Sequence, residues 1–189
     1  MPTRSTPVRS ALARAGALLG VASAAHKLAV RVGHPIPYHV ALPVRACIEE
    51  DAAGLLVARA GALVVLVVAR DMLARDGNPP PVPGTAPRRI LTSIIMGSDA
   101  LLFGVLAEEF RSRELELENV VQGTGTLDGE RAVCVQGRFD EHGPGGWMEI
   151  CGTVKDGVLY VLAFTGPGAD LRAHEPLRAR IRESFVLPR

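Results

Sequence analysis

The 189-residue sequence has little of several features that would point to a particular class of protein. Aromatic residues make up only 4% of it, and the net charge of +1 provides no strong field to attract nucleic acid or an anionic membrane. No apolar run is long enough to span a bilayer, because the best candidate, residues 55–69, is short and contains Arg59. Apolar residues at 48% and charged residues at 22% are instead typical of a globular protein with a sizeable core.

Cysteine is also scarce, with Cys47, Cys134 and Cys151 as the three examples. An odd number at wide spacing does not resemble a disulfide framework, and the absence of a CxxC pair gives no sign of a zinc or redox site. We therefore expect these cysteines to be buried as small apolar residues. No metal ion and no cofactor is expected.

Motifs that carry catalysis are missing as well. The sequence contains no GxSxG, no HExxH and no GxxxxGK, and its five histidines are scattered over predicted loops and element ends. The glycines of residues 122–129 lead into a strand, so no helix N-terminus follows them to hold phosphate groups. The Asp-Glu-His run at 140–142 fits a solvated hairpin tip, and Glu175 beside His174 fits a charge that stabilises a helix N-terminus. We predict that the protein is not an enzyme.

The N-terminal region has two interpretations. Helical spacing of apolar residues predicts a helix over residues 9–32, which the prolines of residues 33–37 end. Alternatively, three arginines, a weakly apolar run over 15–22 and the small residues 22–24 resemble a secretory signal. We favour a retained helix and a cytoplasmic protein, with export to the periplasm as the alternative.

Seven strands are predicted in the rest of the chain. Alternation of apolar and polar residues marks most of them, whereas residues 62–69 are apolar throughout and fit a strand covered on both faces. Asp-Gly at 128–129 and 156–157 is a strong hairpin signal, because glycine accepts the positive φ of such turns. The acidic residues 49–51 are assigned to a loop. The predicted strands are 38–42, 55–59, 62–69, 115–127, 130–139, 147–154 and 158–165.

Two further helices are predicted. Thr85 caps the first, with Pro87 in its first turn, and this helix kinks or restarts at Ser98 and ends near Arg113. Helical spacing defines an apolar stripe on it and a buried face on a final helix that starts at Glu175. The stripe contains Ile90, Ile94, Leu101, Val105 and Leu106, and the final helix buries Leu177, Ile181 and Phe185.

This order of elements predicts an α+β fold, in which helices flank an antiparallel sheet of about seven strands. An extra N-terminal helix forms an extension over residues 1–34, and one α/β domain covers residues 35–189. Contact of residues 1–32 with a membrane is left open.

One face of the sheet is the candidate binding surface. Alternation places one set of side chains on the core side (Val133, Val135, Phe139, Met148, Ile150 and Val154). The opposite side carries Gln136, Arg138, Trp147, Glu149 and Cys151, beside Cys134 and Thr153. Mixed aromatic, amide and charged groups on an open face suit protein recognition, since tryptophan and arginine are enriched there. The alternative interpretation, given equal weight, is that a helix such as the N-terminal one covers this face.

The order of elements resembles the PsbP-like α/β/α sandwich, and within it the DcrB family and the Eag chaperones of type VI secretion. Residues 161–177 (VLAFTGPGADLRAHEPL) look like that family's last strand, loop and helix start, and residues 67–71 (VVARD) like the end of its third strand. The family's partner-contacting glutamine falls near Cys151. The resemblance implies a non-enzymatic chaperone, often dimeric, whose sheet face holds apolar helices of a toxin before secretion.

We therefore expect a non-catalytic partner-binding protein, a chaperone or adaptor that holds an apolar segment of a client protein. A homodimer is compatible with this prediction, and no nucleic-acid partner is expected. The alternative is an exported or membrane-associated accessory protein of the PsbP or DcrB kind.

Overall fold

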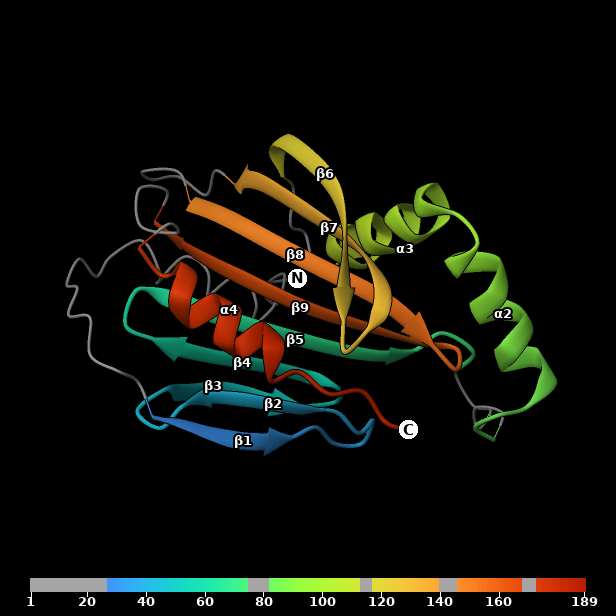
Figure 1. The fold of residues 1–189 in the computed structure, drawn as a ribbon, viewed down its shortest axis with the longest axis horizontal. Coiled ribbons are helices and arrows are strands. Elements are labelled where there is room, and N and C mark those ends of the chain that lie inside the picture. Colours follow the sequence, from blue (N-terminus) through green and yellow to red (C-terminus); the bar gives the residue numbers. More distant parts are fainter. Residues whose placement is uncertain (1–26, 75–81, 113–116, 140–145, 168–172) are drawn as a thin grey trace, which may run out of the picture.

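The computed structural model describes residues 27–74, 82–112, 117–139, 146–167 and 173–189 (Figure 1). In these ranges the chain forms strands and helices in the order β1 (Leu28–Val32), β2 (His39–Pro43), β3 (Cys47–Ala52), β4 (Leu55–Ala60), β5 (Leu63–Asp71), α2 (Ala86–Met96), α3 (Asp99–Ser112), β6 (Glu118–Leu127), β7 (Glu130–Phe139), β8 (Gly146–Lys155), β9 (Val158–Pro167) and α4 (Glu175–Glu183). The predicted helix over residues 9–32 falls mostly outside the described residues.

Seven of the strands form one antiparallel sheet in the order β3-β4-β5-β9-β8-β7-β6. The predicted α+β class, with helices flanking a seven-stranded antiparallel sheet, is therefore confirmed. One member of the sheet was predicted wrongly. Residues 39–43 pair with β1 in a separate two-stranded sheet, and the acidic segment assigned to a loop is the edge strand β3. Carboxylates on an edge strand stay in water. The acidic residues therefore interrupt the apolar alternation by which a strand is recognised in the sequence.

The end of the predicted N-terminal helix was also wrong. Residues 28–32 form β1, which pairs antiparallel with β2 from Leu28 opposite Pro43 to Val32 opposite His39. Valine at 30 and 32 favours a strand, because β-branched side chains fit the pleated backbone better than a helix. The pairing joins residues on both sides of the domain boundary predicted after residue 34.

The predicted hairpin turns are confirmed. Asp128 and Gly129 join β6 to β7 with φ of 49° and 76°, and Asp156 and Gly157 join β8 to β9 with φ of 46° and 72°. Two consecutive positive φ angles match the right-handed twist of the flanking strands, and this is why Asp-Gly is favoured in two-residue turns.

Helices α2 and α3 pack on one face of the sheet, called here the α3 face (Figure 1). Leu102, Leu106 and Phe110 of α3 contact the apolar side chains of β7 and β8 there. Gly152 of β8 allows this approach, because a Cβ at that position would lie 2.3 Å from Leu106 Cδ2. The core side predicted for β7 and β8 is confirmed for Val133, Val135, Met148, Ile150 and Val154.

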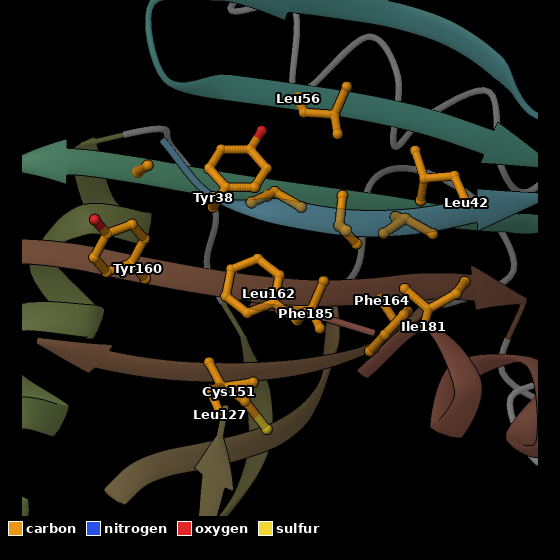
Figure 2. Close-up of a cluster of buried hydrophobic side chains, with 14 of the residues drawn as sticks. Tyr38, Leu42, Leu56, Leu127, Cys151, Tyr160, Leu162, Phe164, Ile181 and Phe185 are labelled. Carbon is orange, nitrogen blue, oxygen red and sulfur yellow. The ribbon is translucent and has the colours of Figure 1, made fainter. Parts of the chain in front are cut away.

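Helix α4 and strand β2 cover the other face, called here the α4 face (Figures 1 and 2). Leu177, Ile181 and Phe185 are buried against it, as predicted for the final helix. Phe185 also stacks on Tyr38, which precedes β2, with ring centroids 5.8 Å apart. The sheet therefore has a core on each face, which explains why residues 63–69 of β5 are all apolar.

The apolar stripe predicted along residues 86–112 was wrong in part. Ile90, Ile94 and Leu101 are 59%, 57% and 49% exposed, whereas Ile95 and Leu102 are buried. The physical reason is the break at residues 97–98, which bends α2 from α3 by 104° and prevents one continuous stripe. Ser98 caps α3, with its Oγ accepting a 3.4 Å hydrogen bond from the Leu101 N–H. Thr85 occupies the N-cap position of α2 without a side-chain capping bond.

No single helix among the described residues has the length and apolar composition needed to cross a membrane. Only α2 and α3 taken together meet that test, as a sharply bent pair and by length and composition alone.

Candidate functional site

The five predicted binding residues lie on β7 and β8 and point to the α4 face, but this face is only partly open. Gln136 and Arg138 are exposed, and Trp147 is half-buried. Glu149 and Cys151 are 5% and 3% exposed, so the expected open surface is wrong for these two. The alternative of a covering helix is correct for Glu149, on which α4 packs. A binding role for the five residues stays a prediction.

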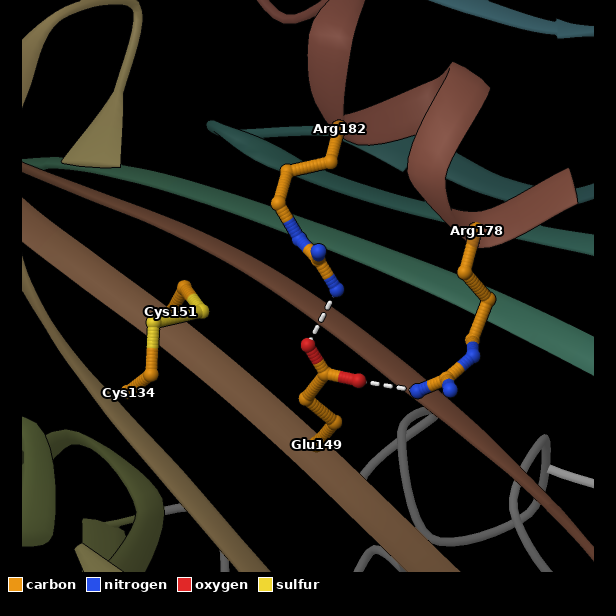
Figure 3. The surroundings of a disulfide bond; sticks show 5 residues. All are labelled: Cys134, Glu149, Cys151, Arg178 and Arg182. Carbon is orange, nitrogen blue, oxygen red and sulfur yellow. Dashed lines mark hydrogen bonds and ion pairs between the residues drawn. A yellow bond between two sulfur atoms is a disulfide. The ribbon is translucent and has the colours of Figure 1, made fainter. Parts of the chain in front are cut away.

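A buried ion-pair network holds α4 on this face (Figure 3). The Glu149 carboxylate accepts hydrogen bonds from the guanidinium groups of Arg178 and Arg182, one on each oxygen. Arg178 also pairs with Glu175 in the first turn of the helix. Arg182 lies over the Phe164 ring, 5.9 Å from its centroid. Removing one partner of a buried pair leaves an uncompensated charge. Glu149, Arg178 and Arg182 therefore have a structural role, which is to hold α4 on the sheet.

A disulfide joins Cys134 to Cys151 beside this network (Figure 3). The expectation of three buried, unpaired cysteines was therefore wrong, and Cys47 is free and exposed. Sequence alternation places Cys134 and Cys151 on the same sheet face, and the register of β7 on β8 sets them directly opposite each other. The disulfide ties the two strands together on the α4 face.

Other buried charged groups are also used in structural pairs. Arg88 pairs with Asp71 and donates a 2.7 Å hydrogen bond to the Asp156 carbonyl, which attaches α2 to the β8–β9 turn. Glu109 of α3 lies 2.9 Å from Arg70 of β5. Burial raises the pKa of Tyr38 well above its usual value, and burial followed by the nearby Asp156 raises the pKa of Tyr160 to about 12.

The motifs considered for catalysis are not assembled into a site in the described part of the chain. Residues 140–142 lie outside it, and His174 is the N-cap residue of α4. No group of three or more His, Cys, Asp and Glu side chains there is placed to hold a metal ion.

A cavity of about 370 Å³ lies on the α3 face, between α3 and the strands β6, β7 and β8. Its volume falls in the range of ligand sites, roughly 300–1,000 Å³. Among the described residues that line it, Arg111 is the one that carries a charge. The cavity is lined by Phe103, Leu106, Ala107, Phe110, Arg111, Leu117, Val120, Val135 and Ile150.

Sequence reasoning missed this cavity, although part of its signal was present. Phe103, Ala107 and Phe110 recur at spacings of four and three, which places them on one side of a helix. The small Ala107 between two phenylalanines leaves space that a larger side chain would fill. Val120 lines the cavity while 44% exposed, so the cavity reaches the edge strand of the sheet.

Comparison with known proteins gives structural neighbours only. No protein-family model matches the chain, and no curated protein matches it. A protein from Bacteroides thetaiotaomicron is similar at 11% identity and a TM-score of 0.47, over 80% of this chain, which spans 45% of that one.

Two further solved structures are similar over nearly their whole length. PA94 of Pseudomonas aeruginosa, a protein of unknown function, is 13% identical with a TM-score of 0.45, over 86% of this chain and 97% of its own. The cyanobacterial PsbP protein CyanoP of Synechocystis is 12% identical with a TM-score of 0.46, over 90% of this chain and 99% of its own. At this level of identity, neither likeness assigns a function.

Proposed function

We propose that this protein is a non-catalytic partner-binding protein, a chaperone or adaptor that holds an apolar segment of a client protein in the cavity beside α3. The observation that carries the proposal is the composition of that cavity, in which eight of the nine described lining residues are apolar. A pocket with this lining favours an apolar occupant, because burial of apolar surface supplies most of the binding free energy.

The distribution of charged groups supports a binding role over a catalytic one. The buried carboxylates Glu149 and Glu109 each pair with arginine. Arg111, at the cavity, is itself paired with Glu108 at 2.5 Å. A catalytic site needs a titratable group within hydrogen-bond reach of the reacting atoms, and the described part of the cavity lining offers this arginine alone.

The resemblance to the Eag chaperones supports a more specific form of the proposal. In that family the client segment is an apolar helix of a secreted toxin. The described residues of the motifs that carry the resemblance, 161–177 and 67–71, do not line the cavity, and the family's partner-contacting position falls near Cys151 on the α4 face. In this finer form, the proposal is that the client belongs to type VI secretion and that the protein works as a dimer.

The proposal is tested with a matched pair of variants on α3. Ala107→Phe fills the cavity, whereas Ala100→Phe makes the same change at an exposed position of the same helix. The probe is a fluorescent peptide of about 16 leucine and alanine residues with lysine ends, which supplies a continuous apolar segment. We expect Ala107→Phe to weaken its binding by about tenfold or more, a loss of roughly 1.4 kcal/mol, and Ala100→Phe to leave it unchanged. Equal affinity of both variants would contradict the proposal.

A second candidate, an exported accessory protein, is favoured by the Cys134–Cys151 disulfide. Structural disulfides form and persist mainly in oxidising compartments such as the periplasm and are rare in the cytosol. Export agrees with the signal-like features of residues 1–24. N-terminal sequencing of the protein purified from its native cells tests this candidate: cleavage after a small residue near position 24 supports it, and an intact start with reduced cysteines opposes it.

A further inference from the structure

The two edges of the sheet differ in how they are protected. The edge strand β3 carries Glu49, Glu50 and Asp51, and charge of this kind discourages pairing with another chain. The other edge strand, β6, has no charged residue and no proline from Asn119 to Leu127. Its register shift lies near its start, between Glu118 and Val121. In the described part of the chain no strand pairs with the outer side of β6.

The direction of the free backbone groups on β6 follows from the disulfide. Directly opposed residues of antiparallel strands lie about 4.5 Å apart when they are not hydrogen-bonded and about 5.5 Å apart when they are. The Cα atoms of Cys134 and Cys151 are 4.1 Å apart, so this pair is not hydrogen-bonded. Cys134 therefore directs its N–H and C=O to β6, where its partner is Gly123. The N–H and C=O groups of residues 122, 124 and 126 consequently point to the open edge.

The same strand adjoins the cavity beside α3. Ile150, Val135 and Gln122 form one row across β8, β7 and β6, and the first two line the cavity. A strand added to β6 would lie about 4.8 Å beyond it. The next side chain in this row would then point to the α3 face, beside Val120 at the mouth of the cavity.

We propose that β6 accepts an extended, uncharged segment of the partner polypeptide as an eighth strand, with a bulky apolar side chain of that segment in the α3 cavity. This inference rests on the proposed partner-binding function and gives the bound segment an extended conformation, in place of the helix that the resemblance implies. Main-chain hydrogen bonds to residues 122, 124 and 126 supply affinity, and the cavity selects the side chain. The lack of charge on residues 119–127 of β6 selects an uncharged strand, because a charged one would lose hydration without gaining an opposite charge.

The test uses the full chain and a blocked heptapeptide, Thr-Val-Thr-Phe-Thr-Val-Thr, as probe. Thr124→Pro removes one outward N–H at a position where an edge strand tolerates proline, and Thr124→Ala changes the side chain but keeps that N–H. A second peptide, N-methylated at alternate residues, lacks the backbone N–H donors of those residues. Comparing the two peptides therefore requires no variant of the protein. Isothermal titration calorimetry measures each affinity, and far-ultraviolet circular dichroism checks the folding of each variant.

We expect Thr124→Pro to weaken binding by about tenfold or more, since it removes a hydrogen bond and places a ring in the path of the added strand. Peptide N-methylation is expected to act similarly, and Thr124→Ala to have little effect. Equal binding of the methylated peptide, or no saturable binding of the unmethylated one to the wild type, would overturn the inference. If Thr124→Pro does not fold, the comparison of the methylated and unmethylated peptides on the wild type still tests strand addition.

Two further outcomes separate this inference from the proposed function and from self-association. In one outcome, Ala107→Phe weakens binding of the leucine-alanine probe while Thr124→Pro and N-methylation have no effect. That result would contradict strand addition and support the proposed function. If Ala107→Phe affects neither probe, the proposed function falls. A wild-type dimer that Thr124→Pro dissociates would assign the edge to a second copy of the chain and overturn the inference.

Discussion

The two faces of the sheet are covered in different ways. On the α4 face, a disulfide, a buried ion-pair network and a stacked aromatic pair hold β7, β8, α4 and the segment before β2 in place. On the α3 face, the core between helix and strands is apolar and leaves a cavity open to an uncharged strand edge. Covalent and ionic links therefore hold the α4 face together, whereas the α3 face contains the cavity that we propose as the partner site.

The largest expected effect is on the α4 face, at Glu149. Glu149→Ala leaves the buried Arg178 without its main partner, and breaking a buried pair typically costs about 3–5 kcal/mol. Urea unfolding measures the loss. Glu175→Ala is the matched control, because Glu175 pairs with the same arginine but is half exposed, where pairs contribute about 0–1 kcal/mol. Equal losses for the two variants would show that Glu149 does not hold α4.

The disulfide should have the next largest effect. Its cysteines are 17 residues apart, and closing a loop of about that length stabilises a protein by roughly 3 kcal/mol in the chain-entropy model. Cys134→Ser combined with Cys151→Ser should lower the free energy of unfolding by up to this amount. Cys47→Ser is the control, because Cys47 is exposed and unpaired and should have no effect. A wild type insensitive to reductant would contradict the prediction.

Alkaline pH should weaken the α4 face through Tyr160. An unfolded tyrosine loses its proton near pH 10, whereas the pKa of Tyr160 in the folded protein is about 12. Above pH 10 the unfolded state therefore binds fewer protons than the folded one, and the free energy of unfolding falls as pH rises towards 12. Urea unfolding between pH 9 and 11 measures the slope. Tyr160→Phe should make it shallower, with Tyr38 supplying the remainder; an unchanged slope would be the contrary result.

The smallest stability effect is expected on the α3 face. Ala107→Phe places a ring in existing space, so it should change the free energy of unfolding by less than about 1 kcal/mol while blocking the cavity. Thermal and urea unfolding, compared with Ala100→Phe, measure this change. A loss of several kcal/mol would mean that the cavity collapses around Ala107 in solution, and the contrast between the faces would disappear.

Much of the fold could be predicted because its signals are local. The Asp-Gly turns at 128–129 and 156–157, the apolar strand β5 and the buried face of α4 depend on neighbouring residues only. Strand β3 was missed because its carboxylates conceal its alternation. The N-terminal helix was extended over β1 because residues 28–32 can be fitted to helical spacing as well as to a strand.

The site was harder to predict because it depends on tertiary packing. Alternation correctly grouped Gln136, Arg138, Trp147, Glu149 and Cys151 on one face. Whether that face is open depends on where α4 packs, and no local pattern specifies its contact with Glu149. The disulfide depends on the register between β7 and β8, which no recognisable turn motif fixes. The cavity is lined by α3 and the three strands that follow it in the chain, and the space between them depends on how the helix packs on the sheet.

The most direct test of the account maps where an apolar segment binds. Amide chemical-shift changes on adding the Thr-Val-Thr-Phe-Thr-Val-Thr peptide report this for both faces in one titration. The account predicts the largest changes at Ala107, Phe110 and residues 120–126. Changes concentrated at Gln136, Arg138 and Trp147, with none along α3 and β6, would contradict it and return the binding site to the α4 face.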